Sequence, residues 1–149
     1  MRRLIALFLM LALLASFGGC KKAEAIDSED FINSVLKNIQ FDDEVAEINE
    51  GVIERLYSMP EGVSGRVLIG SGATAEEVSV FTAADEKGAK AMEENAKTHI
   101  EEQSEVYASY LPDEVERLKN AVVIRQGLSV VVVVSADSQA EEKVNEILK

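Results

Sequence analysis

The sequence predicts an α+β fold in which an antiparallel sheet of about four strands is covered by helices. Apolar residues recur at helical spacing in some segments and alternate or run continuously in others, which indicates both helices and strands. The predicted strands form two neighbouring pairs, each joined by a connection that contains glycine, as in β-hairpins. The expected order is a helix, a short helix, two strands, a helix, two strands and a helix, which is typical of α+β proteins.

The first helix is expected to run from about Ser28 to Gln40. Ser28 is a good capping residue, and the two acids that follow it suit the first turn. Apolar residues then recur at helical spacing, at Phe31, Ile32, Val35, Leu36 and Ile39. A short second helix is expected around Val52–Tyr57, ended by Met59-Pro60 and Gly62.

The first predicted hairpin consists of residues 63–69 and 78–82. Residues 63–69 alternate, with Val63, Gly65, Val67 and Ile69 on one side, as expected for a strand. The connection Gly70–Ala73 could bring backbone N–H groups close to an anion. However, no phosphate-loop lysine follows it, and Glu76 and Glu77 would oppose an anion there. We therefore interpret this segment as a flexible hairpin connection.

A long helix is expected from about Asp85 to Ser109, with a short helical segment after Pro112. The second hairpin should join residues 121–125 to residues 129–135 through a turn at Gly127. The last strand contains five consecutive valines, which suits the interior of a sheet because an exposed apolar strand invites aggregation.

The closing helix should be capped by Asp137 or Ser138 and should extend through Leu148. Together these elements predict one α+β domain over residues 27–149.

The N-terminus has the pattern of a secretory signal peptide. Arg2 and Arg3 precede an apolar run of fourteen residues, 4–17. A membrane-spanning helix needs about 20 such residues, so this run is short for a permanent span. Small residues follow the run, and then comes Cys20, the only cysteine of the chain. This order resembles a bacterial lipobox, although Phe17 stands where leucine or valine is usual.

The lipobox resemblance implies that the thiol of Cys20 receives a diacylglyceryl group and that the leader is cleaved between Gly19 and Cys20. Residues 1–19 would then be the signal peptide, and residues 20–26 the attachment cysteine and a short tether. Two or more acyl chains hold a protein firmly to a bilayer, so we expect a lipid-anchored protein on the extracytoplasmic face of the cell membrane. An ordinary free or buried cysteine and an uncleaved anchor helix are the alternatives.

The composition limits the possible partners and cofactors. The chain has 15 Lys and Arg against 27 Asp and Glu, and cleavage would remove two arginines, leaving 13 − 27 = −14. Nucleic acid is a poor partner for such a surface, because phosphate binding depends on lysine and arginine. A lipidated Cys20 would leave no free thiol, and His99 is the only histidine. We therefore expect no disulfide, no metal site and no cofactor.

Three segments together resemble domain-of-unknown-function family 4358, a group of small bacterial lipoproteins. The segments are GSGATAEEVSVFTA (70–83), YASYLPDEVERLKNAVV (107–123) and Gly127 with the valine strand after it. The resemblance covers essentially residues 20–148 and implies the location and the architecture, but no reaction. The chain departs from the family pattern at His99, where arginine is expected, and at Ser129, where an aromatic residue is expected.

Three residues of the long helix are candidates for ligand contact: His99, Gln103 and Tyr107. His99 and Gln103 interrupt an apolar stripe at helical spacing, composed of Ala89, Met92, Ala96, Val106, Tyr107 and Tyr110. The alternative is a hydrogen-bonded polar pair at the rim of the core. His99 lacks a visible nucleophile to activate and a second His or Cys at ligand spacing.

The acidic residues offer a further candidate chemistry. They cluster at residues 42–44 and along the long helix at 93, 94, 101 and 102, but without the spacing of a calcium-binding loop. We interpret them as a solvated face.

Two functions remain open at this point. One is a non-catalytic binding or accessory module for an unknown envelope protein, peptide or glycan. The other is a carboxylate-dependent cell-envelope hydrolase, which would need two acids converging in one cleft.

Overall fold

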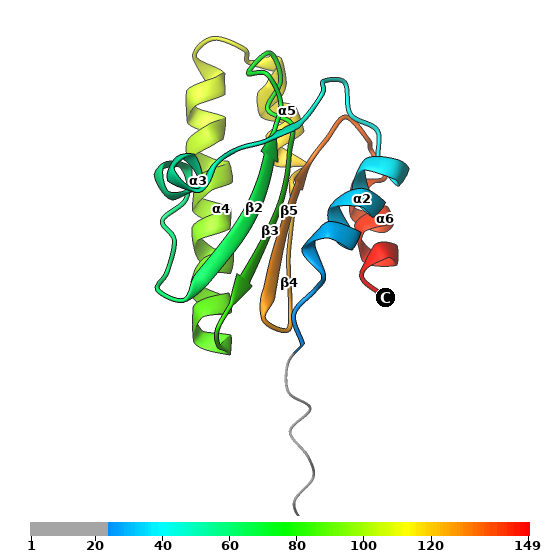
Figure 1. Ribbon diagram of the computed structural model, residues 1–149. Coiled ribbons are helices and arrows are strands. Elements are labelled where there is room, and N and C mark those ends of the chain that lie inside the picture. Colours follow the sequence, from blue (N-terminus) through cyan, green and yellow to red (C-terminus); the bar gives the residue numbers. More distant parts are fainter. Residues whose placement is uncertain (1–23) are drawn as a thin grey trace, which may run out of the picture.

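A computed structural model describes residues 24–149 (Figure 1). The predicted signal peptide, its cleavage position at Gly19 and the predicted attachment residue Cys20 lie outside the described residues. In chain order the elements are α2 (Ser28–Asn38), β1 (Ala46–Glu47), α3 (Glu50–Leu56), β2 (Val63–Ile69), β3 (Glu77–Ala83), α4 (Glu86–Ala108), α5 (Asp113–Lys119), β4 (Val122–Gln126), β5 (Ser129–Val134) and α6 (Ala140–Ile147).

The strands form one antiparallel sheet in the order β1-β2-β3-β5-β4. Both predicted hairpins are confirmed, and pairing of β3 with β5 joins them into one sheet. The described residues contain one strand more than the four expected. This strand is β1, whose Ala46 and Glu47 pair with Ile69 and Leu68 at the edge of the sheet.

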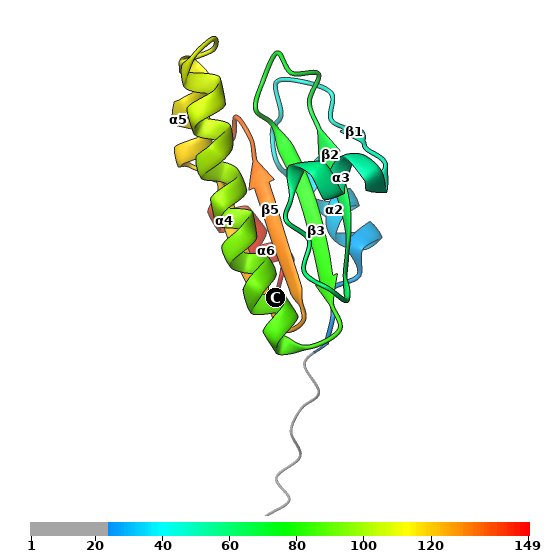
Figure 2. The same cartoon turned by 90° about the vertical axis from the view of Figure 1, so that its left-hand side faces the viewer.

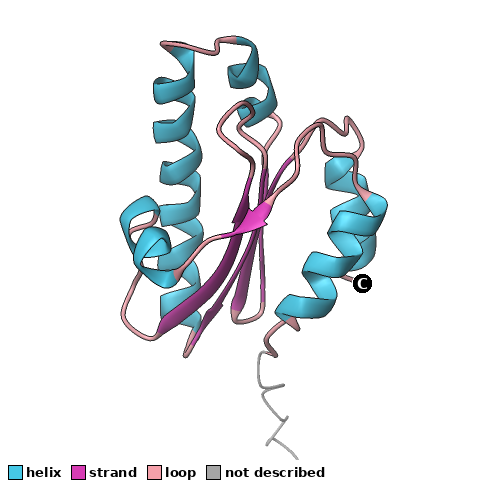
Figure 3. Cartoon of the chain, turned by 45° about the horizontal axis from the view of Figure 1, so that its top comes forward, coloured by secondary structure: helices cyan, strands magenta, loops and turns pink. Residues whose placement is uncertain are grey.

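Helices cover both faces of the sheet, as Figures 1 and 3 show. One face packs against α4 together with α3 and α5, and the other packs against α2 and α6. Figure 2 shows α4 running along the length of the sheet. The predicted α+β class, with an antiparallel sheet under helices, is therefore confirmed.

Strand β5 is the centre of both hydrophobic layers. It lies between β3 and β4, and each of its five valines is fully buried. Because side chains of a strand alternate between the two faces, Val131 and Val133 join the α2–α6 layer. Val130, Val132 and Val134 join the α4 layer. The interior position predicted for the valine run is confirmed.

The helix caps differ from the prediction. Asp27, and not Ser28, caps α2, because its carboxylate accepts hydrogen bonds from the backbone N–H groups of Glu29 and Asp30 at 3.0 Å. Ser28 is the first helical residue. At the closing helix the cap position is Gln139, and not Asp137 or Ser138 as predicted. The Asp137 carboxylate instead accepts from the Gln139 N–H in the turn before the helix.

The expected apolar stripe of α4 is wrong at two positions. Ala89, Met92, Ala96 and Tyr107 are buried as expected. Val106 and Tyr110 are 52% and 53% exposed. Successive helical residues are about 100° apart around the axis, so burial of Tyr107 turns Val106 away from the sheet. Tyr110 lies beyond the end of α4 and stacks on Tyr107, with ring centroids 5.1 Å apart.

The chain enters the fold beside the β4–β5 turn, at the lower end of the sheet in Figure 1. The backbone N–H of Ile26 donates to the Ser129 hydroxyl at 2.9 Å, and the N–H of Leu128 donates to the Glu24 carbonyl at 3.4 Å. Gly127 has φ +59°, which favours glycine at this tight turn. None of the helices in residues 24–149 has the length and apolar character that a bilayer span requires.

Candidate functional site

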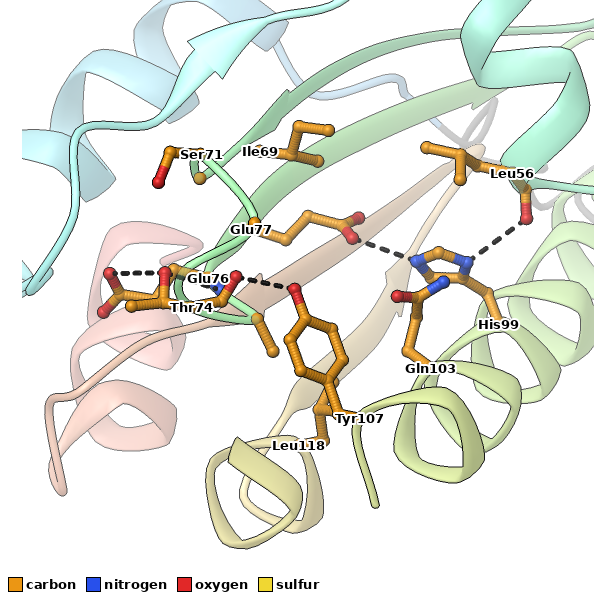
Figure 4. Close-up of a pocket in the computed structure, with 13 residues that line it drawn as sticks. Leu56, Ile69, Ser71, Thr74, Glu76, Glu77, His99, Gln103, Tyr107 and Leu118 are labelled. Atoms are coloured by element: carbon orange, nitrogen blue, oxygen red, sulfur yellow. Dashed lines mark hydrogen bonds and ion pairs between the residues drawn. The ribbon is translucent and has the colours of Figure 1, made fainter. Parts of the chain in front are cut away.

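A pocket of about 190 Å³ lies between the β2–β3 connection and the C-terminal half of α4 (Figure 4). The connection and the first residue of β3 supply lining residues between Gly70 and Glu77, within the GSGATAEE segment. From α4 come His99, Gln103 and Tyr107, and Leu118 of α5 closes one side. The pocket is therefore formed where the first hairpin turns beneath the long helix.

His99, Gln103 and Tyr107 all line this pocket, which brings the three predicted contact residues together. They lie four residues apart on α4, and side chains at this spacing share one face of a helix. The sequence spacing therefore correctly placed them side by side. Their contact with a ligand stays a prediction.

The imidazole of His99 is buried and makes two polar contacts. Its Nδ1 lies 3.2 Å from the carbonyl oxygen of Leu56, and its Nε2 lies 3.0 Å from a carboxylate oxygen of Glu77. A carbonyl oxygen only accepts hydrogen bonds, so Nδ1 must carry a hydrogen. The contact of Nε2 with Glu77 then needs a second hydrogen, on one or the other of the two groups. This hydrogen bond joins His99 of α4 to Glu77 of β3 inside the core.

Two hydroxyl groups complete the surroundings of Glu77. Tyr57 and Ser79 both donate to its other carboxylate oxygen, Oε1. The Tyr57 ring also stacks on the His99 ring, with centroids 4.0 Å apart. Burial of Tyr57 raises the pKa of its phenol well above the ordinary value, and the neighbouring Glu77 charge adds to this rise. The phenol therefore remains a hydrogen-bond donor at neutral pH.

This arrangement differs from that of a serine hydrolase. In a nucleophilic triad the serine hydroxyl donates to the imidazole, and the carboxylate bonds to the opposite ring nitrogen. Here the Ser79 hydroxyl donates to the carboxylate, and both nitrogens of His99 already have protein partners. The geometry makes His99 and Glu77 a structural pair that ties α4 to β3 and to the end of α3.

Of the three α4 residues that line the pocket, Gln103 is the one whose polar group has no partner among residues 24–149. Its half-buried side chain lines the pocket and makes no hydrogen bond with the other residues in the part of the chain that the structure describes. Tyr107, one turn further on, donates to the Thr74 carbonyl at 2.7 Å, which holds the β2–β3 connection against α4. Burial of Tyr107, with a further contribution from Tyr110, raises the pKa of this phenol strongly.

A second polar cluster, centred on Glu76, lies beside the pocket. This glutamate is 1% exposed, and its carboxylate accepts from the backbone N–H groups of Asp42, Asp43 and Ala136 at 2.7–3.1 Å. Arg117 of α5 donates to it at 2.5 Å. One buried carboxylate thus joins three loops and a helix.

Arg117 extends this cluster to two more acids. Its guanidinium contacts Asp42 and Glu114, each at 2.9 Å. Glu114 is buried and accepts from the backbone N–H of Ala75 at 2.7 Å. The guanidinium can make several bonds at once because it carries five N–H donors in a planar group. The β2–β3 connection is therefore fixed to α5 on one side and to α4 on the other.

Asp43 fixes the first part of the same connection. Its carboxylate accepts from both the hydroxyl and the backbone N–H of Ser71 at 2.7 Å. The hydroxyl bond, followed by the backbone bond, lowers the pKa of Asp43 below its ordinary value. The segment from Gly70 to Ala73 lies in the connection between β2 and β3, as interpreted from the sequence, but Ser71 is held by Asp43.

Sequence reasoning missed the buried acids. In the sequence, Glu76 and Glu77 stand out only as groups that would oppose an anion, and nothing distinguishes Glu114 or Arg117 from the other charged residues. One signal was available, because two adjacent acids at the start of a buried strand must point to opposite faces of the sheet. Each of the two then needs its own set of donors. No group of three His, Cys, Asp or Glu suited to a metal occurs in residues 24–149.

The described residues define a three-layer α+β protein with one antiparallel sheet and a pocket of mixed apolar and polar lining at one end. The family described as Domain of unknown function (DUF4358) matches residues 39–135, and the chain belongs to this family. The match spans all five strands and the pocket residues, whereas α2 and α6 lie outside it. No curated protein and no solved structure matches the chain significantly.

Proposed function

We propose that this chain is a lipid-anchored module on the extracytoplasmic face of the cell membrane, attached through Cys20. Its pocket binds part of an envelope protein, peptide or glycan, and the protein acts without catalysing a reaction on it. The observation that carries this proposal is the position of the pocket relative to the point where the chain enters the fold.

The pocket and the N-terminal segment lie at opposite ends of the sheet. Strand β3 begins at Glu77 beside the pocket and ends at Ala83, whose N–H donates to the carbonyl of Leu128 in the β4–β5 turn. Seven residues of strand extend over roughly 23 Å. Glu24 contacts the same turn, and Cys20 precedes it by only four residues. An anchor at Cys20 would therefore leave the pocket open to the envelope.

The pocket suits part of a larger ligand. Pockets for whole drug-sized molecules usually measure about 300–1,000 Å³, and this one is smaller, at about 190 Å³. Its wall combines apolar groups, such as Leu56 and Ile69, with the free amide of Gln103. Such a wall fits one amino-acid side chain or one sugar substituent of a polymer.

The alternative, a carboxylate-dependent hydrolase, receives less support. That chemistry needs one carboxyl group to donate a proton to the substrate and a second to act as base or nucleophile. Glu76 and Glu77 are the acids at the pocket, and protein donors occupy both oxygens of Glu76. Glu77 is likewise enclosed by Tyr57, Ser79 and His99. Release of soluble fragments from purified cell wall by the wild type, and not by Glu77→Gln, would favour the hydrolase.

The anchor can be tested by labelling cells with a clickable fatty acid. The wild type is expected to carry the label and to sediment with membranes, whereas Cys20→Ala should lose the label. Lys22→Ala is a matched control that keeps the cysteine and should behave as the wild type does. An unlabelled wild-type chain, or a chain that keeps its leader by mass spectrometry, would contradict the anchor.

The binding site can be tested with a photo-crosslinking amino acid at Gln103 in intact cells. Lys87, exposed at the opposite end of the same helix, is the matched control position. An adduct with an envelope component is expected from position 103 and not from position 87. Equal adducts from both positions, or none from either, would count against this pocket.

A further inference from the structure

The two edges of the sheet are protected to different extents. Strand β1 forms one edge with only two residues, and short edge strands resist further pairing. Strand β4 forms the other edge over Val122–Gln126. It is apolar over its first three residues and contains no proline, glycine or lysine, which are common means of blocking an edge. This edge is therefore open to another strand.

The hairpin geometry identifies which backbone groups face outward. Gln126 and Ser129 flank the two-residue β4–β5 turn, and such a closing pair exchanges hydrogen bonds. Hydrogen-bonded and non-bonded pairs alternate along an antiparallel ladder. Ile124 and Val122 are therefore bonded to β5, while Val123 and Arg125 direct their N–H and C=O groups away from the sheet.

The same alternation of bonded and non-bonded pairs continues across the sheet to its β1 edge. It predicts that Val67 directs its carbonyl toward β1, and the Ile48 N–H does donate to the Val67 carbonyl at 3.0 Å. No backbone partner occurs for Val123 or Arg125 among residues 24–149 beyond the ladder with β5. The outward groups of these two residues are thus free to pair.

A groove lies along each side of β4. On the α4 side it measures about 550 Å³ and has Ile100, Leu118 and Val123 in its floor. On the α6 side it measures about 390 Å³ and runs beside Val122 and Ile124. A strand added to β4 would direct alternate side chains into the two grooves. Both faces of the β4 edge therefore have a groove where an added strand would place its side chains.

We propose that β4 pairs antiparallel with β4 of a second copy of this chain, which continues the sheet across a two-fold axis at Ile124. In this register Val123 of each copy lies opposite Arg125 of the other. Each of these two pairs can exchange both N–H···O=C bonds. Self-pairing of one surface across a two-fold axis is the commonest form of protein oligomer.

The other registers are less favourable. A shift that centres the axis on Arg125 would place two arginines directly opposite each other, and like charges in this position are destabilising. A shift that centres it on Val123 would pair Arg125 with Ala121, whose N–H already donates to the Leu118 carbonyl. A register shifted by an odd number of residues would place Val123 or Arg125 opposite residues such as Ile124, whose N–H and C=O groups already bond to β5.

Charge supports the same register. In it, Arg125 of the second copy lies over Val123 at the α4-side groove, where Glu101 stands at the rim. Glu101 is exposed and has no ion-pair partner within the described part of the chain. The two lysines of this groove, Lys97 and Lys119, are already paired with acids of their own helices. Arg125 bonds within its own chain through Nε, which donates to Glu93 at 2.8 Å. Its terminal N–H groups have no partner among the described residues, so the added arginine can also donate to Glu101.

The position of β4 also reduces repulsion between copies. The chain has a formal net charge of −12, which keeps identical molecules apart over most of their surface. Near β4 the cations Lys97, Lys119 and Arg125 each pair with an acid of their own chain, so this edge carries less unbalanced negative charge.

The test uses Ile124→Cys in a Cys20→Ala background, so that the engineered thiol is the only one and the result does not depend on lipidation. Ile124 and its symmetry mate form a non-hydrogen-bonded pair with Cα atoms about 4.5 Å apart, which is within disulfide range. Mild oxidation is expected to convert most of the chain to a covalent dimer on a non-reducing gel. Gln126→Cys, whose expected neighbour is Val122, should not cross-link alone.

Two further variants test the register and the fold separately. The double variant Val122→Cys, Gln126→Cys should cross-link where neither single variant does. Val123→Pro removes an outward N–H while keeping the ladder with β5, a substitution that edge strands tolerate. It should keep the wild-type circular dichroism spectrum and be monomeric by analytical ultracentrifugation, whereas the Cys20→Ala parent is dimeric.

Two results would overturn the proposal. One is a monomeric parent at all concentrations, with no more cross-linking from position 124 than from position 126. The other is an Ile124→Cys thiol that is protected from maleimide in cells but never cross-links, since a strand of another protein would then occupy the edge. Loss of the fatty-acid label at Cys20 would leave the dimer unaffected, so the two proposals fail independently.

Discussion

His99 and Glu77 occupy a part of the core where most neighbours are apolar. Transfer of two ionisable groups from water into a protein interior is unfavourable unless each finds partners. These two have them, because the carbonyl of Leu56 and the hydroxyls of Tyr57 and Ser79 satisfy the remaining polar atoms. No buried side-chain polar atom of residues 24–149 lacks a hydrogen-bond partner. The cluster therefore depends on all of its members.

Removal of either member of the pair should be strongly destabilising. We expect His99→Leu or Glu77→Leu to lower the free energy of unfolding by about 3–5 kcal/mol, because each leaves the other group buried without its partner. The double variant should lose clearly less than the sum of the two. Urea unfolding of all four proteins measures this coupling. Additive losses would mean that the two groups do not act as a pair.

Asp43 should give the protein part of its acid sensitivity. Hydrogen bonds from Ser71 depress its folded-state pKa below 3.8, its ordinary value. The resulting stabilisation is fully present above the unfolded-state value and is lost as the pH falls through the folded-state value. The urea midpoint of Asp43→Asn should therefore lie below that of the wild type at pH 7, and the gap should narrow below pH 3.8. A gap that is independent of pH would contradict this role.

At the scale of elements, Gly65 determines how closely β2 and β3 can pack on the α4 face. It lies opposite Phe81, and a Cβ atom there would stand 2.4 Å from the phenyl ring. Gly65→Ala should therefore cost about 1–3 kcal/mol, as overpacking of a core usually does. The loss should shrink in a Phe81→Leu background, which makes room for the methyl group. An equal loss in both backgrounds, by urea unfolding, would point to a backbone effect.

The long elements could be predicted because each carries many residues of one pattern. The valine strand and the long helix were placed almost to the residue. Strand β1 could not be found, because two residues show no alternation and their pairing depends on Ile69 and Leu68 far along the chain. The cap of α2 was misplaced because Asp27 and Ser28 are adjacent and both are good caps.

The pocket was predicted only in part. Helical spacing alone put His99, Gln103 and Tyr107 on one face, since it depends on local geometry. The partner of His99 could not be read from the sequence, because Glu77 lies 22 residues away and only the pairing of the sheet brings it near. Arg117 was missed for the same reason, since its partners Asp42 and Glu76 come from other parts of the chain.

At the scale of the whole molecule, Arg117 links the two helical layers at the pocket end of the sheet. Its α5 helix packs in the α4 layer, while the loop at residues 42–43 continues from α2 of the other layer. The carboxylate of Glu76 lies between these two segments and bonds to both. The cluster thus joins the two helical layers through polar contacts at this end of the sheet.

Loss of this arginine should loosen the pocket end first. We expect Arg117→Leu to destabilise the protein by about 3–5 kcal/mol, since it leaves Glu76 buried without its cation. Amide hydrogen exchange should accelerate most at Asp42 and Asp43, which donate to Glu76. Lys119→Leu on the same helix is the matched control, because its exposed pair with Glu116 should be worth less than about 1 kcal/mol. Uniform acceleration across the sheet would contradict a local role.

The contact between Glu24 and the β4–β5 turn has a mechanical consequence. If the chain is held at Cys20, any drag on the bound partner pulls on the segment Glu24–Ile26 along the direction of the strands. The bonds to Leu128 and Ser129 then take the first load, before it reaches α2. The Cβ atom of any side chain at position 127 would lie 2.4 Å from the Glu24 carbonyl oxygen and would displace the segment Glu24–Ile26. The absence of a side chain at Gly127 therefore allows the N-terminal segment to stay bonded to the β4–β5 hairpin.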